Sequence, residues 1–219
     1  STPKRALDPA AMAGTDVYKV IAGCVVPRPI GFLSTVSREG VRNAAPYSFF
    51  NAMSHLPPMV IASIAPVFSQ GNRMKDTLRN ILDTNEFVVN IVDEAIAKAQ
   101  DDCSEEFPPD VDEIAASGLT SVPGTVVRAP RIVEAPVNLE CRLIRTITIP
   151  ELDCPHTLVL GHVVMMHVRE DILLPNGRID PVRLAAVGRM TGNSYIRTRD
   201  LFTLEHNTFD ILPPGSTPA

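Results

Sequence analysis

Short apolar runs separated by turn-forming residues dominate the central part of the chain. Residues 30–37 are rich in apolar and β-branched side chains, residues 38–40 form a glycine-containing turn, and residues 41–48 return as a partner strand. The compact apolar runs at residues 59–65 and 87–92 have the length of buried strands. We therefore predict a core built largely from short antiparallel strands.

Two longer segments extend this pattern. Residues 137–149 and 156–168 predict long antiparallel strands joined by a polar turn at residues 150–155. Short helices are expected at residues 93–100 and 112–117, and helices do not alternate regularly with strands, which argues against a doubly wound sheet. The fold class that we predict is mainly β with few short helices, closer to a closed barrel than to repeated βαβ units.

One helix is well marked between the strands. Asp76 is expected to cap it by accepting a hydrogen bond from a first-turn amide. Leu78, Ile81 and Leu82 follow at the spacing of one helix face. Asn85 is expected to end the helix, because asparagine tolerates the left-handed conformation.

The composition suits a single folded domain. The chain has 219 residues, a formal net charge of -5 and 45% hydrophobic residues. We place the domain at residues 17–205, after a polar N-terminal arm at residues 1–16 and before a Pro-rich tail at residues 206–219.

The absence of a basic cluster argues against nucleic-acid binding. No uninterrupted apolar stretch approaches the roughly 20 residues of a membrane span, and no signal core follows the N-terminus, so we expect a cytoplasmic protein.

Several kinds of site are not expected. None of the four cysteines lies in a CxxC pair or at metal-finger spacing from a histidine, so we expect reduced thiols and no metal. Cys24 and Cys141 lie in apolar runs, where a cysteine is usually a small buried hydrophobe. The GxGxxG, P-loop, GxSxG, HExxH and EF-hand motifs are absent, which argues against a Rossmann nucleotide site and an ordinary serine hydrolase.

Residues 43–51 combine aromatic and polar side chains after an apolar strand. Pro46 lacks an amide proton, so the strand is expected to bend or reach a sheet edge there and leave the following amides free for a ligand. The aromatic rings offer flat apolar surface and the polar side chains offer donors, which suits a planar heterocycle. A proline-containing edge strand with core aromatics is an equally good interpretation of this segment. The side chains concerned are Tyr47, Ser48, Phe49, Phe50 and Asn51.

A second element lies at the start of the marked helix. Lys75, Asp76 and Thr77 place a cation and a hydroxyl where unpaired helix amides and the helix dipole favour an anion. A phosphate monoester would be well held there. A flat-ring site together with a phosphate site describes FMN or pyridoxal phosphate better than it describes NAD.

In their residues and their order along the chain, these motifs resemble those of the flavin reductase-like FMN-binding family, which includes flavoredoxins. The resemblance rests first on residues 28–64 and 75–92, and then on shorter motifs at residues 107–120, 140–149, 156–164 and 192–202. It implies a split β-barrel with Greek-key character, bound FMN and a homodimer with the flavin near the subunit interface.

The resemblance also implies roles for individual residues. The flavin ring would be lined, mostly through backbone groups, by Ala45, Pro46, Tyr47, Ser48, Phe49, Phe50 and Asn51. Ser34 and Thr35 would lie near the ribityl chain or phosphate, and Ser63, Lys75, Asp76 and Thr77 at the phosphate. Arg28 would border the flavin site, and Tyr195 and Arg197 would close the pocket.

The chain departs from the family before its second long strand. Members that reduce free flavin with NADH often carry Gly-Asp-His there, whereas this chain has Asp153, Cys154, Pro155 and His156. His156 is either a possible nicotinamide contact or a solvent-facing turn residue, and the departure puts nicotinamide use in question.

The function that we expect is that of an FMN-binding oxidoreductase resembling NAD(P)H-dependent flavin reductases. The flavin carries the chemistry, so no catalytic side chain is required. The first alternative is a flavoredoxin-like carrier that keeps FMN bound and exchanges electrons with a protein partner. A pyridoxamine phosphate oxidase-like enzyme and a binding module without turnover are further alternatives.

Overall fold

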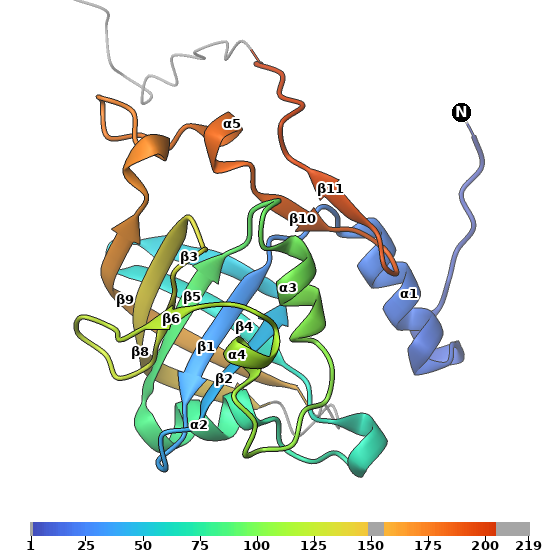
Figure 1. Cartoon of the computed structure of the whole chain (residues 1–219). Helices are drawn as coiled ribbons and strands as arrows, with labels where there is room; N and C mark the ends of the chain where they lie inside the picture. Colours follow the sequence, from blue (N-terminus) through green and yellow to red (C-terminus); the bar gives the residue numbers. More distant parts are fainter. Residues whose placement is uncertain (1, 149–155, 205–219) are drawn as a thin grey trace, which may run out of the picture.

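A curled sheet of seven antiparallel strands forms the body of the protein. The computed structural model describes residues 2–148 and 156–204. Within them, the strand order is β2-β1-β5-β8-β9-β4-β3, and Figure 1 shows the sheet rolling into a barrel that stays open between β2 and β3. The strands are β1 (Gly31–Val36), β2 (Arg42–Tyr47), β3 (Phe50–His55), β4 (Pro58–Ile64), β5 (Glu86–Ile91), β8 (Val137–Thr148) and β9 (Thr157–Val168).

Short helices and two small strand pairs surround this barrel. The α-helices are α1 (Gly14–Cys24), α2 (Asp76–Thr84), α3 (Ala97–Asp102), α4 (Glu113–Ala116) and α5 (Pro181–Leu184), and the 3-10 turns are η1 (Pro9–Ala11), η2 (Phe68–Gln70) and η4 (Glu170–Ile172). The small pairs join β6 (Ser121–Val122) to β7 (Arg131–Ile132) and β10 (Val187–Arg189) to β11 (Tyr195–Arg197). No helix among the described residues has the length and apolarity needed to span a membrane.

The predicted mainly β split barrel with Greek-key character is confirmed. The hairpins β1–β2, β3–β4 and β8–β9 form as neighbours in sequence. β5 then returns beside β1, and β9 returns beside β4. The turn after β1 is also as expected, with Gly40 at a φ of 92°, a conformation that glycine adopts without steric cost.

Strand β1 is buried on both faces, which explains its unbroken apolar run. Leu33 points into the barrel, whereas its neighbour Phe32 belongs to a second cluster with Ile96, Ile114 and Ile132, outside the barrel wall. Successive side chains of a strand point to opposite faces, so both faces must be covered to bury the whole of β1.

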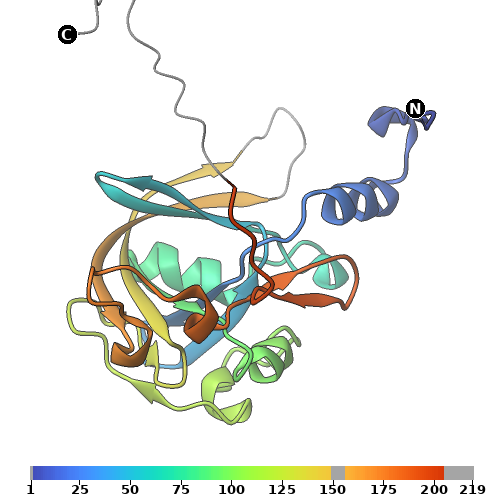
Figure 2. The same ribbon diagram turned by 90° about the horizontal axis from the view of Figure 1, so that it is seen from above.

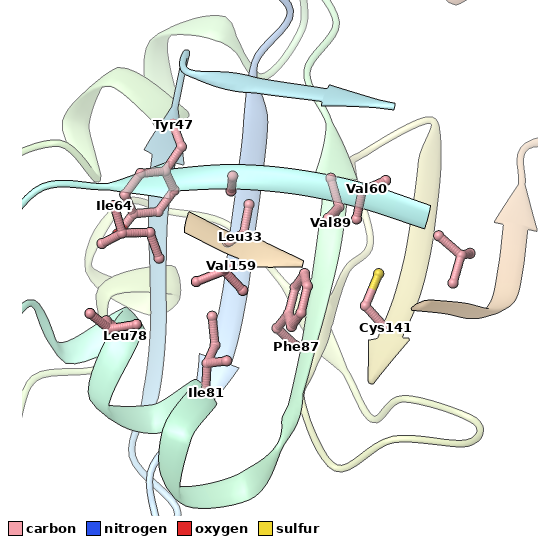
Figure 3. Close-up of a cluster of buried hydrophobic side chains, with 12 residues drawn as sticks. Leu33, Tyr47, Val60, Ile64, Leu78, Ile81, Phe87, Val89, Cys141 and Val159 are labelled. Atoms are coloured by element: carbon pink, nitrogen blue, oxygen red, sulfur yellow. The ribbon is translucent and has the colours of Figure 1, made fainter. Parts of the chain in front are cut away.

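The barrel interior is filled by side chains. Figure 3 shows Phe87 at the centre of a cluster that includes Leu33, Ile81 and Val159. A Cβ atom at Gly161 would lie 2.3 Å from Phe87 Cζ, so the ring occupies the space that a side chain at 161 would need. A ligand of this barrel therefore has to bind on its outer surface.

The marked helix forms with one correction at its start. The cap of α2 is Lys75, which makes no side-chain capping bond, and Asp76 is instead the first helical residue, paired with Arg79 at 2.6 Å. Asn85 ends the helix in the left-handed conformation, as predicted, at a φ of 59°. On the expected apolar face, Leu82 is 42% exposed.

Other differences concern segments with weak local signals. Helix α1 begins at Gly14, inside the segment expected to be an arm, and Figure 2 shows it standing away from the barrel. Cys24 at its end is exposed, contrary to our expectation.

Helix α3 begins at Ala97, later than expected, because the preceding residues form a turn in which Asp93 accepts hydrogen bonds from two backbone amides. Strand β3 was not predicted. The turn at residues 150–155 and the tail at residues 206–219 lie outside the described residues.

Candidate functional site

Strand β2 forms one open edge of the barrel. Among the described strands its one neighbour is β1, and Pro46 lies opposite Phe32 near its end. The expectation that the chain reaches a sheet edge at Pro46 is confirmed, and its physical reason is the missing amide proton. The chain then turns at Ser48 and Phe49 before β3 begins.

Three adjoining hollows follow this edge, and we call them together the edge groove. The small hollow, of about 70 Å³, lies at the start of α2; the middle hollow, of about 190 Å³, lies beside Tyr195; the large hollow, of about 420 Å³, lies over residues 48–51. The small and middle hollows share Pro46 and Ser104, and the middle and large hollows share Ser48. The large hollow has the size of known ligand pockets.

The small hollow brings together the start of α2 and the end of β2. Lys75, Asp76 and Thr77 line it together with Ala45 and Pro46. The Lys75 ammonium has no carboxylate within salt-bridge distance among the described residues, whereas Asp76 is engaged by arginines. A helix start with an unengaged lysine is a suitable place for an anion.

A buried carboxylate that the sequence did not reveal also faces the small hollow. Glu113 Oε2 accepts hydrogen bonds from Asn43 Nδ2 at 2.7 Å and from the Ala44 amide at 3.0 Å. Burial raises the pKa of Glu113 to about 7, against the opposing effect of these two hydrogen bonds. The sequence signal was limited to the helix start, where Asp112 caps α4; the burial of Glu113 comes from the packing of α4 on β2.

Asn43 joins this carboxylate to two threonines. Its Oδ1 atom accepts hydrogen bonds from Thr77 at 2.8 Å and from Thr35 at 3.1 Å. Both hydroxyl groups are therefore committed to the protein. Thr35 lies one layer behind the small hollow, and it lines none of the three hollows.

Ser34 lies farther from the groove than the family resemblance implies. Its hydroxyl is fully buried, donates to the carbonyl of Pro130 and accepts from Asn90 at 2.9 Å. It lines none of the three hollows, because the segment around Pro130 covers the outer face of β1 there.

The aromatic residues of the segment face different ways. Tyr47 packs in the barrel core, so its ring is not available as ligand surface, and burial raises the pKa of its hydroxyl. Phe49, Phe50 and Asn51 line the large hollow. Phe50 lies over Gly31, where a Cβ atom would come within 2.6 Å of its ring.

Arg28 lines the large hollow and is almost fully buried. Its guanidinium donates to the carbonyls of Ala22 and Val25 at the end of α1, to the carbonyl of Met190 after β10, and to Ser48 Oγ at 3.3 Å. The guanidinium carbon lies 5.9 Å from the centre of the Phe49 ring. Arg28 thus fixes the wall of the large hollow.

Ser63 lies in the large hollow, away from the phosphate-type residues with which it was expected. Its hydroxyl is 3.1 Å from His156 Nδ1. The His156 ring in turn stacks on Phe49, with a centroid separation of 6.4 Å, and Phe68 lies at the same separation from it. His156 is therefore part of an aromatic cluster beside the large hollow.

Only one of the two C-terminal candidates reaches the groove. Tyr195 lines the middle hollow, and its hydroxyl donates to Asp101 at 2.7 Å and accepts from Gln100 at 3.1 Å. Burial raises the pKa of Tyr195. Arg197 pairs with Glu94 at 2.9 Å and does not line the edge groove.

The fold and the groove define a class before any comparison is made. The barrel is filled, so a ligand would lie along its open edge. One end of that edge carries a lysine and helix amides, and the other carries aromatic and amide side chains. This is a split-barrel protein with an external candidate ligand site.

Comparisons with known proteins give the family. The model of the flavin reductase like domain matches residues 22–182. A protein of Aquifex aeolicus (strain VF5) is 38% identical over 184 residues, which cover 84% of this chain and 91% of that protein. The chain therefore belongs to the flavin reductase like domain family.

Two solved structures are similar along their whole length. Nitrilotriacetate monooxygenase component B from Bacillus cereus is 33% identical with a TM-score of 0.87, over 93% of this chain and 100% of that chain. The Pseudomonas fluorescens 2-nitrobenzoate 2-nitroreductase NbaA is also 33% identical, with a TM-score of 0.83, over 97% of this chain and 100% of that chain. Family and neighbours support a flavin-related oxidoreductase in general terms.

Proposed function

We propose that this chain binds FMN in the edge groove and acts as an oxidoreductase of the flavin reductase type. The observation that carries the proposal is the continuity of the groove. A phosphate-type end and a ring-type end adjoin through Pro46 and Ser48, in a chain of the flavin reductase like domain family.

The small hollow fits the phosphate end of FMN. Lys75 has no carboxylate partner among the described residues, and the first amides of α2 have no helical partners of their own. A phosphate that accepts hydrogen bonds from both would be held by the charge-assisted bond to Lys75 as well as by the amides. Thr77 would support it through its backbone, since its hydroxyl is engaged by Asn43.

The middle and large hollows fit a flat ring with polar edges. Ala45 and Pro46 lead toward them along β2, the edge strand of the described sheet. Ser48, Phe49 and Asn51 would border the ring, and Arg28 would hold Ser48 in place. FMN, when bound, would supply the redox chemistry, and the protein would bind and orient it.

The electron donor that we propose is NADH or NADPH, with a flavoredoxin-like exchange with a protein partner as the second candidate. The observation that favours the second is the engagement of His156, whose Nδ1 atom lies within hydrogen-bond distance of Ser63. A histidine already engaged in this way is less free to contact nicotinamide.

We further propose that the chain acts as a homodimer. Helix α1 buries only Ala22, whereas Tyr18, Val20 and Ile21 are exposed on it. Ile21 also lines the large hollow, so a second copy seated on α1 would help to close the groove. Exposed apolar residues gathered on one element are typical of interaction surfaces.

The test compares FMN with riboflavin, which lacks the phosphate. We expect tighter binding of FMN, and Lys75→Ala should weaken it by roughly one to two decades, since a charge-assisted hydrogen bond contributes about 1.5–3 kcal/mol. Lys98→Ala is the matched control, because Lys98 is exposed on α3 and does not line the edge groove. Equal affinities for FMN and riboflavin would refute the phosphate assignment.

A further inference from the structure

The small hollow carries more negative than positive charge, which is unusual for a phosphate site. Two cations line it, Arg73 and Lys75. Arg73 is already paired with Asp76 at 3.4 Å. Four carboxylates line the same hollow: Asp76, Glu105, Glu106 and Glu113. A phosphate dianion would therefore be repelled if all four were ionised, and one protonated carboxyl would reduce that repulsion substantially.

Glu113 is the carboxyl whose surroundings favour a proton. It is buried, whereas Glu105 and Glu106 are both exposed at the rim. The titratable groups that face it are Lys75 and Asp76 from the start of α2, Cys103 after α3, and Tyr47 on β2. Of these groups, only Lys75 favours the ionised form of Glu113. Burial outweighs the effect of Lys75 and raises the pKa of Glu113 to about 7.

The hydrogen bonds of Glu113 also indicate which oxygen would carry the proton. Both hydrogen bonds to Glu113 end at Oε2, and Oε1 has no hydrogen-bond partner in the part of the chain that the structure describes. A proton on Oε1 leaves the two bonds to Asn43 and Ala44 intact. It also turns the group that faces the small hollow from an acceptor into a donor.

We propose that Glu113 is a proton-linked binding residue: its neutral carboxyl donates a hydrogen bond from Oε1 to the phosphate of the bound nucleotide, and binding is accompanied by uptake of one proton there. This inference rests on the proposed FMN site and adds a regulation to it. The flavin nucleotide binds more tightly at lower pH, and a rise in pH above neutrality favours its release.

The experiment measures FMN and riboflavin affinity between pH 7 and pH 8.5, where the FMN phosphate is already largely dianionic, since its second pKa is about 6. Wild-type affinity for FMN should fall roughly tenfold over this range by linkage, and riboflavin affinity should stay constant. Glu113→Gln should abolish the pH dependence, because its amide donates without titrating. Glu105→Gln is the matched control: it removes a charge from the same hollow and should retain the pH dependence.

Calorimetry of the wild-type protein in two buffers of different ionisation enthalpy provides a second measurement that needs no variant. At pH 8, FMN binding should take up between about half a proton and one proton. An FMN preference over riboflavin with the same pH profile in wild type and Glu113→Gln, or with no proton uptake, would overturn this inference alone. The absence of any FMN preference would overturn the inference and the phosphate site together.

Discussion

Glu113 should link folding stability to pH even when no ligand is bound. The pKa of Glu113 is raised from 4.5 to about 7 in the folded protein, because burial disfavours its ionised form. The neutral form of Glu113 is the one that the folded protein favours. The stability of the folded protein is therefore fully present below about pH 4.5 and decreases as pH rises through 7, where Glu113 must ionise in its buried position. At 1.36 kcal/mol per unit, the shift makes the folded protein about 3 kcal/mol less stable at pH 8 than it would be with an uncharged group there.

Urea unfolding of wild type and Glu113→Gln at pH 5 and pH 8 would measure this directly. Glutamine keeps the shape and an acceptor for Asn43 and the Ala44 amide, and it cannot ionise. We expect the variant to be more stable than wild type by up to about 3 kcal/mol at pH 8, with most of the difference gone at pH 5. A difference that does not depend on pH, or a variant that is less stable at pH 8, would refute the reasoning.

Three further outcomes are expected. Glu140→Gln should destabilise the protein by about 2 kcal/mol at pH 7. Burial alone would raise the pKa of Glu140, but hydrogen bonds from the amides of residues 125–127 and from His167 outweigh burial and lower that pKa. Urea unfolding should therefore show the difference in stability between variant and wild type shrinking as pH falls below 4.5. Light scattering should give a dimer at micromolar concentration, and an FMN-bound monomer would contradict the role proposed for α1. In stopped-flow measurements we expect the bound FMN to be reducible: rapid, saturable bleaching by NADH or NADPH would support the proposed donor, and slow reduction by both would favour the flavoredoxin-like exchange with a protein partner.

The parts of the fold that follow from local signals could be predicted from the sequence. The β1–β2 hairpin carries its own turn at Gly40, and Asn85 marks the end of α2 by its tolerance of positive φ. Strand β3 was missed because it is an edge strand with mostly exposed side chains and an irregular register between Ala52 and Ser54, so no apolar alternation marks it. Its order comes from pairing with β4.

The candidate site was predictable in outline but not in its layers. Pro46 and Lys75 could be identified from the sequence, because one lacks an amide proton and the other carries a positive charge at a helix start. The structure places both in one hollow. Ser34 could not be excluded from the sequence, because its burial depends on a segment almost 100 residues away, around Pro130. Glu113 could not be found for the same reason: a glutamate at a helix start usually faces solvent, and only the packing of α4 on β2 buries it.

Arg28 makes the two ends of the folded chain depend on one another. Its side chain joins the last turn of α1 to the carbonyl of Met190, a contact that spans 162 residues of sequence. A proteolytic cut between β9 and β10 that released the C-terminal hairpin would leave a buried guanidinium short of an acceptor, which is energetically costly. The same guanidinium also donates to Ser48. Loss of the C-terminal hairpin would therefore loosen the wall of the large hollow and the attachment of the N-terminal helix.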